Sequence, residues 1–203
     1  MALGSFVYIS NVNNLSDARY AAGMFVDLIG FKLDQNNESS LNLEQFREIS
    51  EWISGVKIVG EFGTATPEEI GALIKEYAVD YILVSNESQI HDYAMLGLPL
   101  ILRVETLNNH ELDSTLNYCS GVADYFLFES EKNDLNSTEM ELIKKLTIEY
   151  PILLGYGVTQ QNANSIVDEL RLKGIALKGS PELRPGYKDF DDMADILEAL
   201  EID

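Results

Sequence analysis

The chain has 203 residues, of which 46% are hydrophobic and 24% are charged. This length is enough for one domain, spanning 1–203, with a sizeable buried core. Fourteen lysines and arginines stand against 34 aspartates and glutamates, so the formal net charge is −20 at pH 7. With no excess of basic residues to offset phosphate repulsion, we expect neither nucleic acid nor a membrane surface as a partner. A bound anion would depend on local dipoles and a few cations.

Cys119 is the single cysteine, so an internal disulfide and a zinc cluster of cysteines are both excluded. It falls late in an expected helix and is interpreted as a packed core residue. The residue pattern gives no sign of a metal or an organic cofactor. No signal peptide is visible at the N-terminus, and no apolar run approaches the roughly 20 residues that span a bilayer. We therefore expect a cytoplasmic protein.

Short apolar runs alternate with amphipathic segments along the whole chain. The runs predict strands at 6–9, 28–32, 56–62, 81–84, 99–104, 125–129, 152–155 and 174–177. Helical periodicity predicts helices at 15–23, 43–53, 67–77, 87–96, 110–119, 137–149, 160–171 and 189–201. Thr66 and Pro67 are typical of a helix start, and Gly23 is typical of a residue just after a helix. The alternation predicts an α/β fold with a parallel sheet, either closed as a (β/α)8 TIM barrel, which fits best, or doubly wound and open.

Two glycine-containing turns follow the last two predicted strands. The first carries Gly155, Tyr156 and Gly157, and the second carries Lys178, Gly179 and Ser180. In barrels of this type, backbone amides after strands 7 and 8 form a phosphate site. The predicted ligands of a phosphorylated small molecule are therefore Gly157, Lys178, Gly179 and Ser180. Tyr156 would either stack on a ligand or occlude the turn, since glycine serves close backbone approach.

Several segments resemble one enzyme family in their order and spacing. They are YISNVNNLSDARYAAGMFVDLIGF (8–31), IVGEFGTATPEEI (58–70), VDYILVSN (79–86), PLILRV (99–104), DYFLFES (124–130) and the region 151–189. Together they resemble phosphoribosylanthranilate isomerase, the barrel enzyme of tryptophan biosynthesis. The resemblance implies a TIM barrel and an Amadori rearrangement, which needs a general acid at the ring oxygen and a general base at the adjacent carbon.

The resemblance also assigns the two catalytic positions. Ser10 stands where the family has its cysteine base, and a serine hydroxyl is too weakly acidic to replace a thiolate without an activating partner. Glu129, followed by Ser130, stands where the family has its acidic Asp-Ser. Three functions remain open. The first two are a divergent barrel with lost or strongly reduced activity and residual anion binding, and an active isomerase with Glu129 as acid. A structural or regulatory partner that uses the outer face is a third.

Four charged residues fall where predicted strands end: Lys32, Glu61, Arg103 and Glu129. Because neighbouring strands end side by side, we expect the pairs Lys32–Glu61 and Arg103–Glu129. Charges inside a barrel must be paired and hydrogen-bonded. The four residues are interpreted either as a rebuilt polar site or as a self-satisfied ion-pair layer. Both a monomer and a homodimer are compatible with such a barrel.

Overall fold

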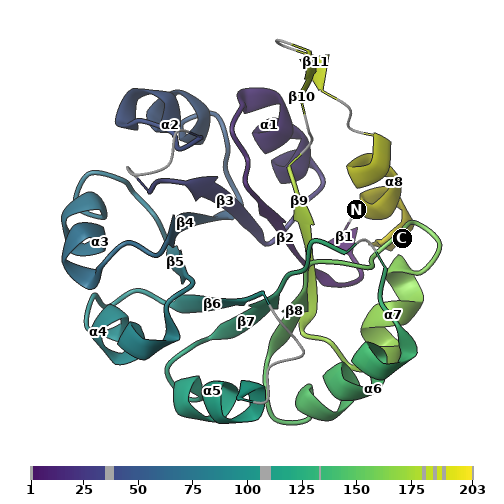
Figure 1. Ribbon diagram of the computed structural model, residues 1–203. Helices are drawn as coiled ribbons and strands as arrows, with labels where there is room; N and C mark the ends of the chain where they lie inside the picture. The colour runs from purple at the N-terminus through teal and green to yellow at the C-terminus, as the bar shows by residue number, and fades with distance from the viewer. Residues whose placement is uncertain are drawn as a thin grey trace.

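The computed structural model describes residues 2–34, 39–105, 111–132, 134–179, 182–184, 187–188 and 191–202. Eight parallel strands close into a barrel in chain order (Figure 1). The strands are β2 (Phe6–Ser10), β3 (Leu28–Lys32), β4 (Lys57–Gly63), β5 (Tyr81–Val84), β6 (Leu100–Val104), β7 (Tyr125–Phe128), β8 (Ile152–Leu154) and β9 (Gly174–Lys178). The predicted single-domain (β/α)8 barrel is confirmed. The open sheet is wrong, because β9 pairs with β2 from Phe6 to Ser10.

Helices surround the barrel in the predicted order. They are α1 (Leu15–Gly23), α2 (Leu43–Ser50), α3 (Pro67–Leu73), α4 (Ile90–Ala94), α5 (Leu112–Cys119), α6 (Ser137–Leu146), α7 (Ala163–Leu170) and α8 (Asp191–Ala199). Most end before the apolar periodicity does, and a 3₁₀ turn, η1 (Glu87–Gln89), precedes α4. Residues 110, 189 and 190 of the predicted helices lie outside the described residues. Within the described residues, no helix is both long enough and apolar enough to cross a membrane.

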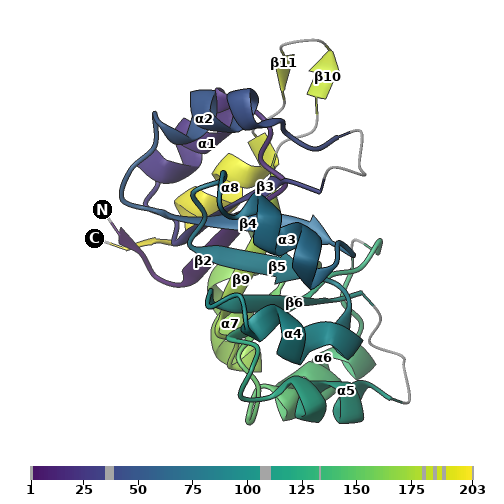
Figure 2. The same cartoon turned by 90° about the vertical axis from the view of Figure 1, so that its left-hand side faces the viewer.

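Two short additions were not predicted from the sequence. β1 (Ala2–Leu3) pairs antiparallel with β12 (Glu201–Ile202), which brings the two chain ends together (Figure 2). β10 (Glu182–Arg184) and β11 (Tyr187–Lys188) form an antiparallel ladder that projects from the barrel (Figure 2). Strands this short carry too few residues to show a period of two.

Side-chain caps fix the starts of α1, α2, α3 and α6. Thr66 accepts the Glu69 amide hydrogen at 3.3 Å, and the Glu69 carboxylate accepts the Thr66 amide hydrogen at 2.7 Å. This reciprocal pair satisfies two amides that have no partner within the helix, and the predicted cap is confirmed. The prediction for Gly23 is wrong, since it is the last residue of α1. The left-handed conformation falls on Phe25 instead, at φ +60°.

The barrel interior is filled by residues that alternate along each strand. They are Tyr8, Leu28, Val59, Leu83, Ile101, Leu127, Leu153 and Ala176. The remaining strand residues pack outward against the helices in a second, larger cluster. Because side chains alternate every second residue, the inward row continues at the strand ends as Ser10, Glu61 and Arg103. The same alternation that fills the core therefore aims these polar side chains at the barrel mouth.

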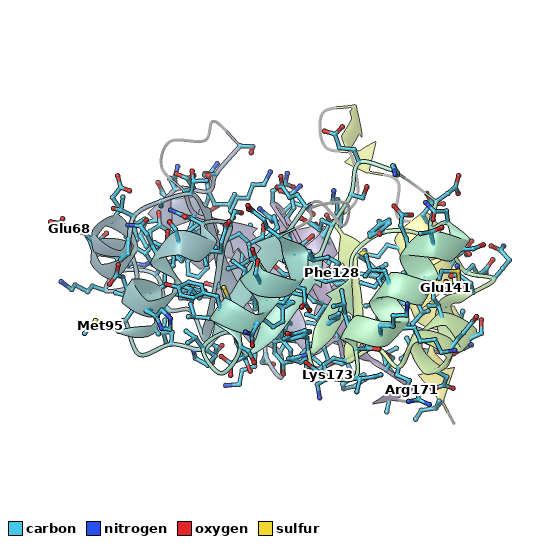
Figure 3. All side chains as sticks on the ribbon, turned by 60° about the horizontal axis from the view of Figure 1, so that its bottom comes forward. Glu68, Met95, Phe128, Glu141, Arg171 and Lys173 are labelled. Atoms are coloured by element: carbon cyan, nitrogen blue, oxygen red, sulfur yellow. The ribbon has the colours of Figure 1, made fainter. Side chains whose placement is uncertain are left out.

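Three aspartates secure the opposite end of the barrel, where the strands begin. Each aspartate lies just before one strand. Its carboxylate accepts a backbone amide hydrogen from the start of the previous strand in the barrel, at 2.8 to 2.9 Å. Its own amide donates to a carbonyl of that strand. The pairs are Asp27 with Val7, Asp80 with Ile58, and Asp124 with Leu100. Lys173 takes the fourth equivalent position, with only the backbone bond to Ile152 at 3.0 Å; Figure 3 shows it at the lower edge of the barrel, away from the β10–β11 ladder.

Candidate functional site

Glu61 lies at the centre of the barrel mouth and is 2% exposed. Its Oε1 accepts the Tyr8 hydroxyl hydrogen at 2.6 Å and the Asn11 amide hydrogen at 2.8 Å. Its Oε2 lies 3.7 Å from Nη2 of Arg103. The predicted Lys32–Glu61 pair is wrong, although Lys32 and Glu61 are register neighbours. The barrel interior lets Glu61 reach two strands away, to Arg103 on β6.

A glycine makes room for this buried carboxylate. A Cβ added to Gly30, on β3, would overlap both Glu61 Oε1 and Tyr8 Oη. The Glu61 carboxylate also shapes the loop after β2, because Asn11 adopts φ +56° and donates its amide hydrogen to Glu61. Sequence reasoning missed Tyr8 as a member of the site. The available signal was a hydroxyl-bearing residue two positions before Ser10 on an inward-facing row.

Arg103 joins Glu61 to Glu129. Its Nε lies 2.7 Å from Glu129 Oε2, so the predicted Arg103–Glu129 pair is confirmed. Burial lowers the pKa of Arg103, but the carboxylates of Glu129 and Glu61 outweigh it and hold that pKa above its ordinary value. Burial raises the pKa of Glu61, against the lowering effect of its bonds to Tyr8 and Asn11 and of the Arg103 charge. Burial and then Glu61 raise the pKa of Tyr8, which remains a hydrogen-bond donor.

Ser10 is 2% exposed, and its hydroxyl donates to the Leu177 carbonyl at 3.3 Å. No carboxylate or imidazole is hydrogen-bonded to it within the described residues. The ring of His91 packs instead against Tyr118 among the outer helices, with centroids 5.0 Å apart, and His110 lies outside the described residues. Cys119 is fully buried, and burial raises the pKa of its thiol to about 11. Neither His91 nor Cys119 supplies a base at the mouth.

The two glycine turns are in close contact with other parts of the chain. A Cβ on Gly157, which has φ +71°, would lie 2.8 Å from the Leu135 side chain. The Gly179 amide already donates to the Ser10 carbonyl at 2.7 Å, and an Asp17 carboxylate oxygen approaches the Gly179 Cβ position to 3.4 Å. Lys178 is exposed. Ser180 lies outside the described residues.

Tyr156 belongs to the apolar core between the barrel and the helices and is 6% exposed. Burial raises the pKa of its phenol, which has no hydrogen-bond partner within the described part of the chain. A ring this deeply buried has no free face for stacking on a ligand base. Of the two sequence-based interpretations, the geometry favours filling of the turn.

Two clefts open beside the ion-pair cluster. The larger, about 560 Å³, is lined by Glu105, Glu129, Ser130, Glu131, Lys132 and Lys178. The smaller, about 190 Å³, includes Ser85, Arg103 and Glu105 in its lining. The larger volume suits a small-molecule ligand. Among the described residues, no three histidine, cysteine, aspartate or glutamate side chains are grouped as they would be around a metal ion.

A closed eight-stranded barrel with its polar side chains at the carboxyl ends of the strands defines a (β/α)8 barrel protein. No protein-family model matches the chain. Phosphoribosyl anthranilate isomerase from Thermotoga maritima superimposes with a TM-score of 0.80 at 22% identity, covering 97% of this chain and 98% of that one. A truncated 3-deoxy-D-arabino-heptulosonate 7-phosphate synthase from the same organism has a TM-score of 0.66 at 16% identity, covering 96% and 85%. These likenesses show the fold.

Sequence comparison gives the narrower similarity. The chain is 26% identical over 206 residues to N-(5'-phosphoribosyl)anthranilate isomerase of Parabacteroides distasonis, covering 96% of this chain and 92% of the relative. It is 24% identical over 191 residues to the protein of the same name from Petrotoga mobilis, covering 90% of each. The resemblance to the phosphoribosylanthranilate isomerase family is confirmed over nearly the whole chain.

Proposed function

We propose that this chain is a phosphoribosylanthranilate isomerase-like barrel that binds a phosphorylated small molecule weakly and has lost, or strongly reduced, the isomerisation. The observation that carries the proposal is the state of Ser10. At the position of the family's base, its hydroxyl is buried and bonded to a backbone carbonyl. A hydroxyl without an adjacent base cannot abstract a proton from carbon at neutral pH.

The arrangement of Glu129 supports the same proposal. At the position of the family's acid, its carboxylate is ion-paired with Arg103, whose Nε lies 2.7 Å from Oε2. A general acid must instead donate a proton to the ring oxygen. Residual anion binding would rest on the Gly157 amide, on Lys178 and on Ser180, because the Gly179 amide is already engaged.

An active isomerase with Glu129 as acid is the second candidate. It is favoured by the cleft of about 560 Å³ that Glu129 shares with Ser130 and Lys178. One related protein was solved with reduced 1-(o-carboxyphenylamino)-1-deoxyribulose 5-phosphate. A ligand of that size would need a cleft of this order to hold both its phosphate and its ring.

Restoring the family's residues tests the proposal. The double variant Ser10→Cys with Glu129→Asp is introduced into a tryptophan auxotroph that lacks this isomerase, beside the unmodified chain. We expect growth only with the double variant, since acid–base groups contribute roughly 10²- to 10⁴-fold in rate. Ser5→Cys, just before the same strand at the barrel's opposite end, is the matched control and should not support growth. Growth with the unmodified chain that disappears with Glu129→Ala would establish the second candidate instead.

A further inference from the structure

One cation at the mouth, Arg103, is already paired with this chain's own carboxylates. Arg103 lies between Glu129, at 2.7 Å from its Nε, and Glu61, at 3.7 Å from its Nη2. Its side chain is 16% exposed, Glu129 is 11% exposed and Glu61 is 2% exposed. Lys132, on the cleft wall, is likewise paired, with Glu139 at 3.3 Å. Among the described residues that line the cleft, Lys178 is therefore the cation that has no ion pair.

Two carboxylates around one guanidinium leave an excess negative charge when both are ionised. Guanidinium binds phosphate and carboxylate ligands through the same N–H donors. An incoming anion must therefore share the guanidinium with Glu129 and approach the Glu61 carboxylate as well, and repulsion between like charges is strong where water is excluded. The structure holds Glu61 firmly in this role, because Tyr8 and Asn11 both donate to its other oxygen.

We infer that Glu61 is a specificity-determining residue. Its carboxylate pairs with Arg103 and lowers the affinity of the mouth for dianions. This inference rests on the proposed anion-binding mouth and explains why binding there is weak. Removing the charge of Glu61 while keeping its shape frees one side of the Arg103 guanidinium. The mouth then becomes a receptor for tetrahedral dianions of the phosphate and sulfate class.

The titratable, charged and hydrogen-bonding groups around Glu61 come from four strands or from the loops that follow them. They are Tyr8 on β2, Asn11 in the following loop, Arg103 on β6 and Glu129 after β7, with Lys32 beside it in register on β3. Burial raises the pKa of Glu61, so acidification discharges it at a higher pH than an ordinary glutamate. Anion affinity of the unmodified protein should therefore rise as pH falls.

Sulfate is the probe, because its charge stays fixed over the pH range in which carboxylates titrate. Calorimetric titration compares the unmodified protein with Glu61→Gln, which keeps an oxygen for Tyr8 and Asn11. We expect sulfate to bind Glu61→Gln at least about tenfold more tightly. Glu131→Gln is the matched control, since Glu131 lines the same cleft and carries the same charge but has no ion pair with Arg103 among the described residues.

A second titration uses the unmodified protein across a pH series and so does not depend on the variant folding. Sulfate affinity should rise toward acid in the unmodified protein and stay flatter in Glu61→Gln. Equal gains in Glu61→Gln and Glu131→Gln, or no gain in either, would overturn the inference. If the unmodified chain supports growth of the auxotroph, the proposed loss of activity is wrong. That result would leave the sulfate comparison unaffected.

Discussion

The two ends of this barrel are built on opposite plans. Where the strands begin, three aspartates repeat one arrangement, each binding the backbone of the strand before it. Where the strands end, Glu61, Arg103 and Glu129 form one irregular cluster that reaches across the interior. In such barrels the first end serves stability and the second serves function. Here the functional end has also become a packed, self-bonded part of the structure.

Gly30 should show the largest effect, because it tests how tightly the mouth cluster is packed. Gly30→Ala places a Cβ against Glu61 and Tyr8 and should lower the free energy of unfolding by about 3 kcal/mol, the cost of overpacking. Chemical denaturation measures it. Gly23→Ala is the control, since nothing lies within 4 Å of its Cβ position, and it should change stability by about 1 kcal/mol or less. Equal, small effects would mean that the cluster has room to spare.

The aspartates at the other end should show the next largest effect. Asp80→Ala removes the acceptor for the Ile58 amide at 2.9 Å and the partner of Lys57 at 2.8 Å. The expected loss of unfolding free energy is about 2 kcal/mol, typical of a hydrogen bond to a charged group. Asp168→Ala, on the exposed face of α7, should lie within about 0.5 kcal/mol of the unmodified protein. If both variants unfold alike, the repeated arrangement contributes nothing to stability.

The pH dependence of stability should show the smallest effect, and it should have opposite signs for the buried Glu61 and for Glu69 at a helix start. Burial raises the pKa of Glu61, so the folded state binds more protons than the unfolded state above the ordinary pKa of 4.5. Relative to Glu61→Gln, the unmodified protein should therefore lose stability as pH rises through that window. Hydrogen bonds from Thr66 lower the pKa of Glu69. Relative to Glu69→Gln, the unmodified protein should therefore lose stability as pH falls. Denaturation curves at several pH values give both signs, and equal signs would refute the pKa directions.

The fold was predictable from the sequence because it depends on local patterns. Apolar runs of four to seven residues and a cap such as Thr66 place strands and helices without reference to distant residues. The three aspartates were missed, although the runs VDLIGF, VDYILV and ADYFLF repeat the pattern. Their partners lie about 20 residues earlier, beyond any local signal.

The mouth was predictable only in part. Position at a strand end identified Glu61, Arg103 and Glu129, and strand adjacency gave the Arg103–Glu129 pair. Adjacency misassigned Glu61, because inside a closed barrel a side chain can bond across the interior instead of to its neighbour. The engagement of Ser10 and of the Gly179 amide depends on the closure between β2 and β9. That closure pairs the first and last strands of the barrel, and local residue patterns do not give the contacts that it creates.

The rate of conversion of N-(5'-phosphoribosyl)anthranilate by the purified, unmodified protein tests the central claim most directly. It should be measured by the loss of substrate fluorescence beside the Thermotoga maritima enzyme at equal concentration. With Ser10 hydrogen-bonded to a carbonyl and Glu129 ion-paired with Arg103, the rate should be lower by at least about 100-fold. A rate within a few-fold of that enzyme's would contradict the account and show that another group supplies the base.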